Sequence, residues 1–89
     1  MDIRHDPDLQ RFHTVVEGHE AEVSYELEDG TMLITHTGVP KEIGGRGIAG
    51  ELNRVAFDYA RREGLRVRPL CAYAAAWVKR HEEYADLVR

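Results

Sequence analysis

A run of glycines between a strand-like segment and a helix-like segment constrains the fold of this chain more than any other feature. Gly44, Gly45 and Gly47 follow an alternating segment and precede an amphipathic one. The first N–H groups of a helix have no partner within the helix and lie at the positive end of its dipole. Because glycine has no Cβ, an anion can approach these amides closely. The pattern predicts a strand–loop–helix junction that either binds phosphate or forms a plain tight turn.

The spacing of these glycines excludes two common phosphate-binding loops. The segment lacks the Gly-Lys-Ser/Thr ending of the P-loop. It also lacks the spacing of the dinucleotide fingerprint, which requires an acidic residue after a further strand. An anion bound here would therefore have to be held by this loop and its immediate surroundings.

The composition indicates one small domain over residues 1–89, with room for a core and one site. The chain has 12 basic and 16 acidic residues and no basic stripe with interleaved aromatics, so a nucleic-acid partner is not favoured. One cysteine excludes an internal disulfide, and no Cys/His cluster has the spacing of a metal site. We expect no metal, no membrane-spanning segment and a reducing cytoplasmic location.

The N-terminal half is predicted to form a three-stranded antiparallel meander. Residues 11–17 are rich in β-branched and aromatic types, and residues 21–27 alternate apolar with polar side chains. Asp29-Gly30 has the chemistry of a hairpin turn, and residues 31–37 return as the third strand. In this third strand, the period of two places Met32, Ile34 and His36 on one face.

The C-terminal half is predicted to add a helix, a short strand and a closing helix, which makes the fold class α+β. Residues 47–63 have apolar side chains at helical spacing, and Gly64 stands where a left-handed cap is expected. Residues 67–70 form the strand and residues 71–81 the closing helix. Since proline cannot donate to a ladder, the strand is expected to splay from the sheet or simply stop at Pro69.

These segments resemble the small single-domain, YjdJ-type branch of the GNAT N-acetyltransferases. The resemblance covers nearly the whole chain and is strongest in four runs: Thr35-His36-Thr37, Gly45-Arg46-Gly47-Ile48-Ala49, Pro69-Leu70-Cys71 and Tyr84-Ala85-Asp86-Leu87. It implies a minimal GNAT fold in which the strand after the central helix splays from the sheet.

The resemblance also implies a site for acetyl-CoA, in a V-shaped slot between the strand ending near Val39 and the one ending near Cys71. Backbone amides after the glycines would hold the pyrophosphate, and Arg46 would add charge. Lys79 would meet the 3′-phosphate or merely cap its helix. The implied contacts are Val39, Gly44, Gly45, Arg46, Gly47, Ile48, Ala49 and Lys79. The loop departs from the usual pattern at Glu42, where relatives have Gln or Arg.

Three side chains are candidates for the proton transfers that direct attack of an amine on the thioester requires. His36 is a general base or a structural strand histidine. Cys71 accepts a proton or the acetyl group, or packs as a small buried hydrophobe. Tyr73, like Tyr84, protonates the leaving thiolate or packs in the core, where Tyr73 would stack on Trp77.

Two functions follow from the resemblance. The first is an N-acetyltransferase that moves the acetyl group from acetyl-CoA to an amine. The alternative is a non-catalytic CoA-binding or protein-interaction module that retains the fold. The chain omits elements with which larger members enclose their acceptor, so we expect an open acceptor side suited to a cationic protein tail or polyamine, in a monomer or weak homodimer. The acidic residues between 17 and 29 either attract that cation or form a solvated sheet face.

Overall fold

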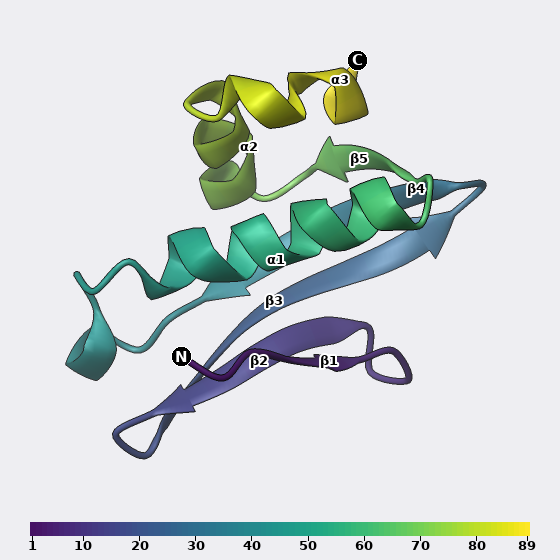
Figure 1. Cartoon of the computed structure of the whole chain (residues 1–89). Coiled ribbons are helices and arrows are strands. Elements are labelled where there is room, and N and C mark those ends of the chain that lie inside the picture. Colours follow the sequence, from purple (N-terminus) through teal and green to yellow (C-terminus); the bar gives the residue numbers. More distant parts are fainter.

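The computed structural model describes residues 1–89 as a five-stranded sheet with a long helix, α1, across one face (Figure 1). The strand order is β1-β2-β3-β4-β5, and the fold is α+β as predicted. The strands are β1 (Arg4–Asp6), β2 (Arg11–Val16), β3 (His19–Glu28), β4 (Thr31–Gly38) and β5 (Arg66–Pro69). The helices are α1 (Ile48–Arg62), α2 (Ala72–Lys79) and α3 (Ala85–Val88), with 3-10 turns η1 (Lys41–Ile43) and η2 (Glu82–Tyr84). None of these helices is long and apolar enough to cross a membrane.

The first four strands form an antiparallel meander, one strand more than the sequence predicted. The addition is β1, a three-residue edge strand of charged residues and a histidine, which carries no strand-like pattern. The β2–β3 and β3–β4 turns hold two residues each with positive φ, Glu17-Gly18 at 50° and 79° and Asp29-Gly30 at 50° and 78°. Such turns match the twist of paired strands and fix the register of the meander.

One hydrophobic core lies between α1 and the sheet. Strand residues such as Val23 and Ile34 are fully buried, as are Leu52, Ala56 and Phe57 of α1. Burial of a side chain of this size stabilises a fold by about 1.5–3 kcal/mol. The core therefore fixes how α1, and with it the glycine loop at its start, sits on the sheet.

The ends of α1 are set by two glycines. Gly47 precedes the helix with φ 78°, and Gly64 follows it with φ 69°. The N–H of Leu65 donates to the Ala60 carbonyl at 2.8 Å, which closes the last turn in the manner predicted for a left-handed cap.

A β-bulge near the end of β4 reverses the side-chain alternation. Tyr25 pairs with Ile34 and Ser24 pairs with His36, so Thr35 is an extra residue on β4. After the bulge, the Thr37 side chain lies on the sheet face that α1 covers, and the His36 side chain lies on the opposite face. The prediction that His36 shares a face with Ile34 was therefore wrong, because one inserted residue shifts the period of two.

The last strand leaves the sheet early, as Pro69 suggested. β5 runs parallel to β4 and pairs with it only from Thr31 to Ile34. The N–H groups of Leu70 and Cys71 both donate to the Ile34 carbonyl, at 2.9 and 3.1 Å, and the chain then turns into α2. Residues 35–38 of β4 consequently have no strand partner on this side. The region between them and the start of α2 is called the slot below.

Candidate functional site

A cavity of about 240 Å³ lies beside the glycine loop. It is lined by Val39, Ile43, Gly44, Gly45, Gly47, Ile48, Ala49 and Tyr73. The predicted residues Arg46 and Lys79 do not line it. Ile43 and Tyr73 were not predicted as cofactor contacts. The cavity thus joins the end of β4, the loop, the start of α1 and the first turn of α2.

The backbone amides from Gly45 to Gly50 donate no hydrogen bond to any backbone or side-chain acceptor. The first helical bond runs from Glu51 N–H to the Gly47 carbonyl at 3.1 Å, and no side chain caps the helix. Helix starts usually satisfy some of these donors with a Ser, Thr, Asp or Asn cap. This run of unpartnered donors at the positive end of the α1 dipole suits a multiply charged anion such as a diphosphate.

The glycine backbone keeps these amides accessible. Gly45 and Gly47 have φ of 74° and 78°, and a Cβ on either would meet no protein atom within 4 Å. The glycines are thus required by the left-handed backbone, and the space in front of them is open. Glu42, whose carboxylate would repel a phosphate, is exposed and does not line the cavity.

Arg46 is held away from the cavity by Glu17 of the β2–β3 turn. Its guanidinium makes two contacts with the carboxylate, at 2.9 and 3.0 Å. This hydrogen bond lowers the pKa of Glu17 and raises that of Arg46. The pair is exposed to water, and the Glu17 carboxylate compensates the positive charge of Arg46 at the surface. The predicted phosphate contact of Arg46 would require it to leave Glu17.

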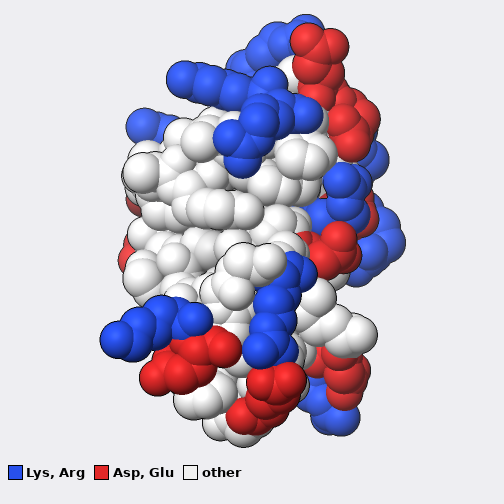
Figure 2. All heavy atoms as spheres, turned by 90° about the vertical axis from the view of Figure 1, so that its left-hand side faces the viewer, with Lys and Arg blue, Asp and Glu red and all other residues white.

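The surface around the cavity is largely uncharged. Figure 2 shows this side of the molecule, with basic side chains along its upper edge and adjoining basic and acidic ones along its lower edge. Lys79 and Arg80, at the end of α2, are both exposed. An anion at the loop would therefore be held by backbone amides far more than by nearby lysine or arginine.

At the inner end of the slot, three polar side chains from separate elements meet. The Thr37 hydroxyl lies 3.5 Å from Cys71 Sγ, and Asn53 Nδ2 donates to Thr37 Oγ1 at 3.2 Å. Cys71 is the N-cap of α2, and its Sγ accepts from Ala74 N–H at 3.4 Å. The sequence singled out Cys71 but missed Thr37 and Asn53. The sequence held one signal for Asn53: it is a polar residue directly after the apolar Leu52 on the inner face of α1.

The other proton-transfer candidates lie apart from this cluster. His36 is exposed on the sheet face away from α1 and does not line the cavity. Tyr73 lines the cavity and is 38% exposed, and its expected stacking on Trp77 does not occur, because Trp77 stacks on His81 instead. Tyr84 is buried, with its hydroxyl donating to Asp58 at 2.6 Å, which fits the packing interpretation.

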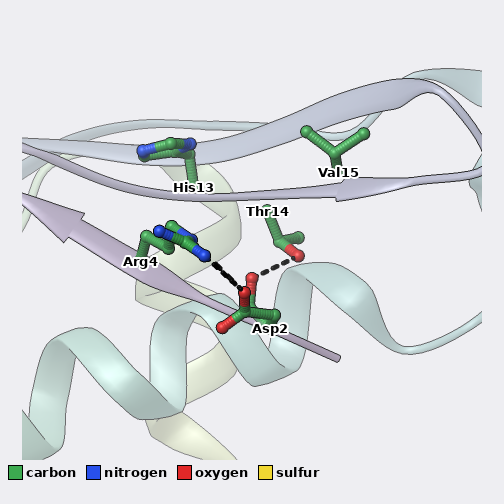
Figure 3. Close-up of a pocket in the computed structure, with 5 residues that line it drawn as sticks. All are labelled: Asp2, Arg4, His13, Thr14 and Val15. Carbon is green, nitrogen blue, oxygen red and sulfur yellow. Dashed lines mark hydrogen bonds and ion pairs between the residues drawn. The ribbon is translucent and has the colours of Figure 1, made fainter.

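A second hollow, of about 130 Å³, lies at the opposite edge of the sheet between the N-terminus and β2 (Figure 3). Three of its polar residues contact one another: Arg4 pairs with Asp2 at 3.2 Å, and Thr14 donates to the Asp2 carbonyl at 2.9 Å. The fourth, His13, has its Nδ1 buried without a hydrogen bond. Asp2 and Arg4 are both exposed. This hollow offers no unpartnered donors comparable to those of the glycine loop.

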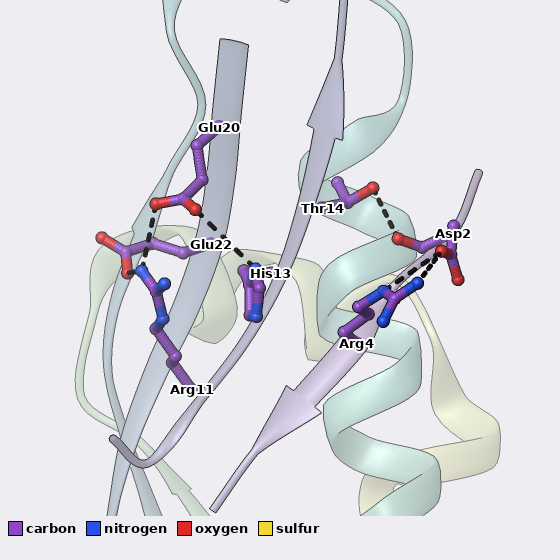
Figure 4. A network of polar contacts seen from close by, with 7 residues as sticks. All are labelled: Asp2, Arg4, Arg11, His13, Thr14, Glu20 and Glu22. Atoms are coloured by element: carbon purple, nitrogen blue, oxygen red, sulfur yellow. Dashed lines mark hydrogen bonds and ion pairs between the residues drawn. The ribbon is translucent and has the colours of Figure 1, made fainter. Parts of the chain in front are cut away.

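Three of the acidic residues between 17 and 29 are already paired. Arg11 contacts Glu20 and Glu22, each at 3.1 Å, and His13 lies 3.8 Å from Glu20 (Figure 4). Glu17 is held by Arg46. Among the acidic residues between 17 and 29, those without an ion pair are Glu26, Glu28 and Asp29, which lie toward the β3–β4 turn, at the end of β3 away from the loop. The carboxylates at the loop end of β3 thus form part of a compensated surface network.

Two comparisons with known proteins match this arrangement. A family model described as GCN5-related N-acetyl-transferase matches residues 11–87. The NMR structure of a GCN5-like protein from Staphylococcus aureus superposes with a TM-score of 0.77 at 24% sequence identity, covering 97% of this chain and 85% of that chain. At that identity, the superposition shows a shared fold.

Proposed function

The chain belongs to the GCN5-related N-acetyltransferase family, and from this premise we propose that it transfers the acetyl group of acetyl-CoA to an amine. One observation carries the acetyl-CoA assignment: the unpartnered amides from Gly45 to Gly50 beside the cavity. Their number suits the pyrophosphate of CoA, and Gly45 and Gly47 place no Cβ in the open space beside them. The residues present therefore fit this co-substrate.

Each part of the slot has a proposed role. The loop amides bind phosphate oxygens, and Val39 with the unpaired end of β4 flanks the pantetheine arm. Acetyl-CoA supplies an activated thioester when bound. Beyond this thioester, the reaction needs only correctly placed reacting groups and two proton transfers. The protein therefore acts mainly by orienting the two substrates.

The proton transfers are assigned to side chains near the slot. Cys71 Sγ, at the inner end, takes a proton from the attacking amine, and Tyr73, at the cavity wall, donates one to the leaving thiolate. For an amine that arrives from the opposite sheet face, His36, which is exposed there, takes this proton in place of Cys71. These three roles follow from position, since Cys71 and Tyr73 border the slot on one side and His36 faces the other.

The acceptor is proposed to be an amine that reaches an open site. A cationic protein tail or polyamine fits the overall negative charge of the chain. Among the acidic residues between 17 and 29, however, Glu17, Glu20 and Glu22 are already paired with Arg46 or Arg11. Local charge therefore favours a polycation only weakly, and small amines belong in the same screen.

Calorimetric titration with acetyl-CoA tests the donor site, with ADP and desulfo-CoA as partial ligands. Gly45→Glu should abolish binding, because it places bulk and negative charge against the phosphates. Gly30→Glu is the matched control: Gly30 has φ 78° and open space around it, but lies at the β3–β4 turn. Equal affinities of the two variants would remove the glycine loop from the site.

Activity is then measured with basic peptides, polyamines and small amines, by release of the CoA thiol. We expect transfer to at least one amine class. Tight acetyl-CoA binding without transfer to any amine would contradict the catalytic proposal and leave a CoA-binding module.

A further inference from the structure

The polar cluster at the inner end of the slot has a defined direction. Asn53 Nδ2 also donates to the Ala49 carbonyl at 3.0 Å, and a carbonyl only accepts, so the nitrogen of the amide must face this side. The same nitrogen donates to Thr37 Oγ1. The Thr37 oxygen accepts this bond and keeps its own proton, so the hydroxyl must donate to Cys71 Sγ when the sulfur is a thiolate, which can only accept.

Two donors consequently converge on one sulfur. The Thr37 hydroxyl approaches Sγ from β4, and the Ala74 N–H approaches it from the first turn of α2. Donors of this kind stabilise the thiolate, which is the reactive form of cysteine. Cys71 is a free cysteine and is partly exposed.

Asn53 is a destabilising residue at this buried position. It is fully buried on α1, and its Oδ1 has no hydrogen-bond partner. An unsatisfied buried acceptor is costly, whereas an apolar side chain of similar shape is nearly neutral or stabilising. The Asn53 amide nevertheless donates the hydrogen bond that orients Thr37. Local rules of folding are broken most often at functional sites.

We propose that Thr37, oriented by Asn53, is a positioning residue that holds and activates the thiol of Cys71 at the inner end of the slot. This inference rests on the proposed acetyl transfer for its purpose, but the geometry it describes is independent of any ligand. Thr37 and Asn53 act through Cys71 and need no contact with either substrate.

The test measures thiol reactivity directly, because Cys71 is the only cysteine of the chain. The rate of alkylation by iodoacetamide is followed by intact-mass spectrometry at fixed neutral pH. Thr37→Val keeps the shape and removes the hydroxyl, and should slow alkylation by about three- to tenfold, the range expected for one hydrogen bond. Thr37→Ser should restore the rate to within about twofold of the original, since a serine hydroxyl presents the same donor.

Thr35→Val is the matched control. Thr35 lies two residues away on the same strand, but its hydroxyl donates to the Ser24 carbonyl at 3.3 Å. Its loss should leave alkylation unchanged. A Thr37→Val variant that alkylates at the original rate, or a Thr37→Ser variant as slow as Thr37→Val, would overturn the proposal.

Asn53→Leu provides a second route, should Thr37→Val be too unstable to study. It removes both amide donors and the unpartnered oxygen, so alkylation should slow while the melting temperature holds or rises. Combined with Thr37→Val, it should add no further slowing, because both act through the same contact. Unchanged alkylation in Asn53→Leu would remove Asn53 from the proposed arrangement.

These measurements separate this proposal from acetyl transfer itself. Alkylation is read without acetyl-CoA, so it reports on Thr37 even if the protein binds no donor. Where transfer is observed, Thr37→Val should lower kcat and leave the calorimetric affinity for acetyl-CoA unchanged.

Discussion

Replacement of Gly47 by alanine isolates the cost of the left-handed residue at the start of α1. Gly47 has φ 78° and ψ 12°, and a Cβ there would meet nothing within 4 Å. The substitution therefore creates no clash, and its cost is backbone strain alone. The left-handed conformation costs an L-residue about 1–2 kcal/mol. Loss of glycine's freedom in the unfolded chain returns about 0.4–1 kcal/mol, so about 1 kcal/mol of net destabilisation is expected.

Thermal unfolding followed by circular dichroism measures this effect. For a domain of this size, about 1 kcal/mol corresponds to a fall in Tm of about 4–8 °C. Gly44→Ala is the matched control, because Gly44 has φ −69°, which alanine adopts readily. Its Cβ would lie 3.3 Å from the Lys41 carbonyl oxygen, a tight contact that a small shift relieves. We expect little change in its Tm.

Equal melting temperatures for the two alanine variants would refute the reasoning, since only Gly47 has a strained backbone. A larger fall for Gly44→Ala would show that crowding against Lys41, and not the left-handed conformation, limits the loop. Either result would also mean that the loop amides are positioned by something other than Gly47.

Two further perturbations test the electrostatics. Burial lowers the pKa of His5, so the unfolded chain binds more protons below about pH 6.5, and stability should fall as pH drops through that region. The urea midpoint measured against pH should show this loss in the original chain and not in His5→Gln. At the loop, Glu17→Gln should release Arg46 and strengthen acetyl-CoA binding in calorimetry, whereas Arg46→Met should weaken it. Unchanged affinity in both variants would exclude Arg46 from phosphate binding.

The elements that the sequence predicted well are those specified by neighbouring residues. The alternation in β3, the helical period of α1 and the glycine at position 64 each depend on a few adjacent residues, and the structure has all of them. The end of β5 at Pro69 belongs to the same group, because a proline ends a ladder by its own chemistry. Val39 and three of the glycines line the cavity, and their contacts with acetyl-CoA stay a prediction from the family resemblance.

The features that the sequence did not predict depend on pairings between distant segments. The bulge at Thr35 exists only in the register between β3 and β4, and it moved His36 to the other face. The contact of Arg46 with Glu17 requires the β2–β3 turn to lie beside the loop. The meeting of Thr37, Asn53 and Cys71 joins β4, α1 and α2. Contacts between distant segments cannot be predicted from neighbouring residues. The one local signal was Asn53, a polar residue among the apolar positions of α1.

Groups that are costly for folding gather at one end of this sheet. The unpartnered amides of residues 45–50, the left-handed Gly47 and the buried Oδ1 of Asn53 all border the slot between β4 and α2. The other buried side-chain atoms without a hydrogen bond, Arg11 Nε and His13 Nδ1, sit in side chains that already contact the carboxylates of Glu20 and Glu22. Every helix start leaves amides free, but α1 also lacks a side-chain cap, and the unpartnered Oδ1 of Asn53 is buried on the same helix. These two features support a ligand at the slot by an argument that does not use family membership.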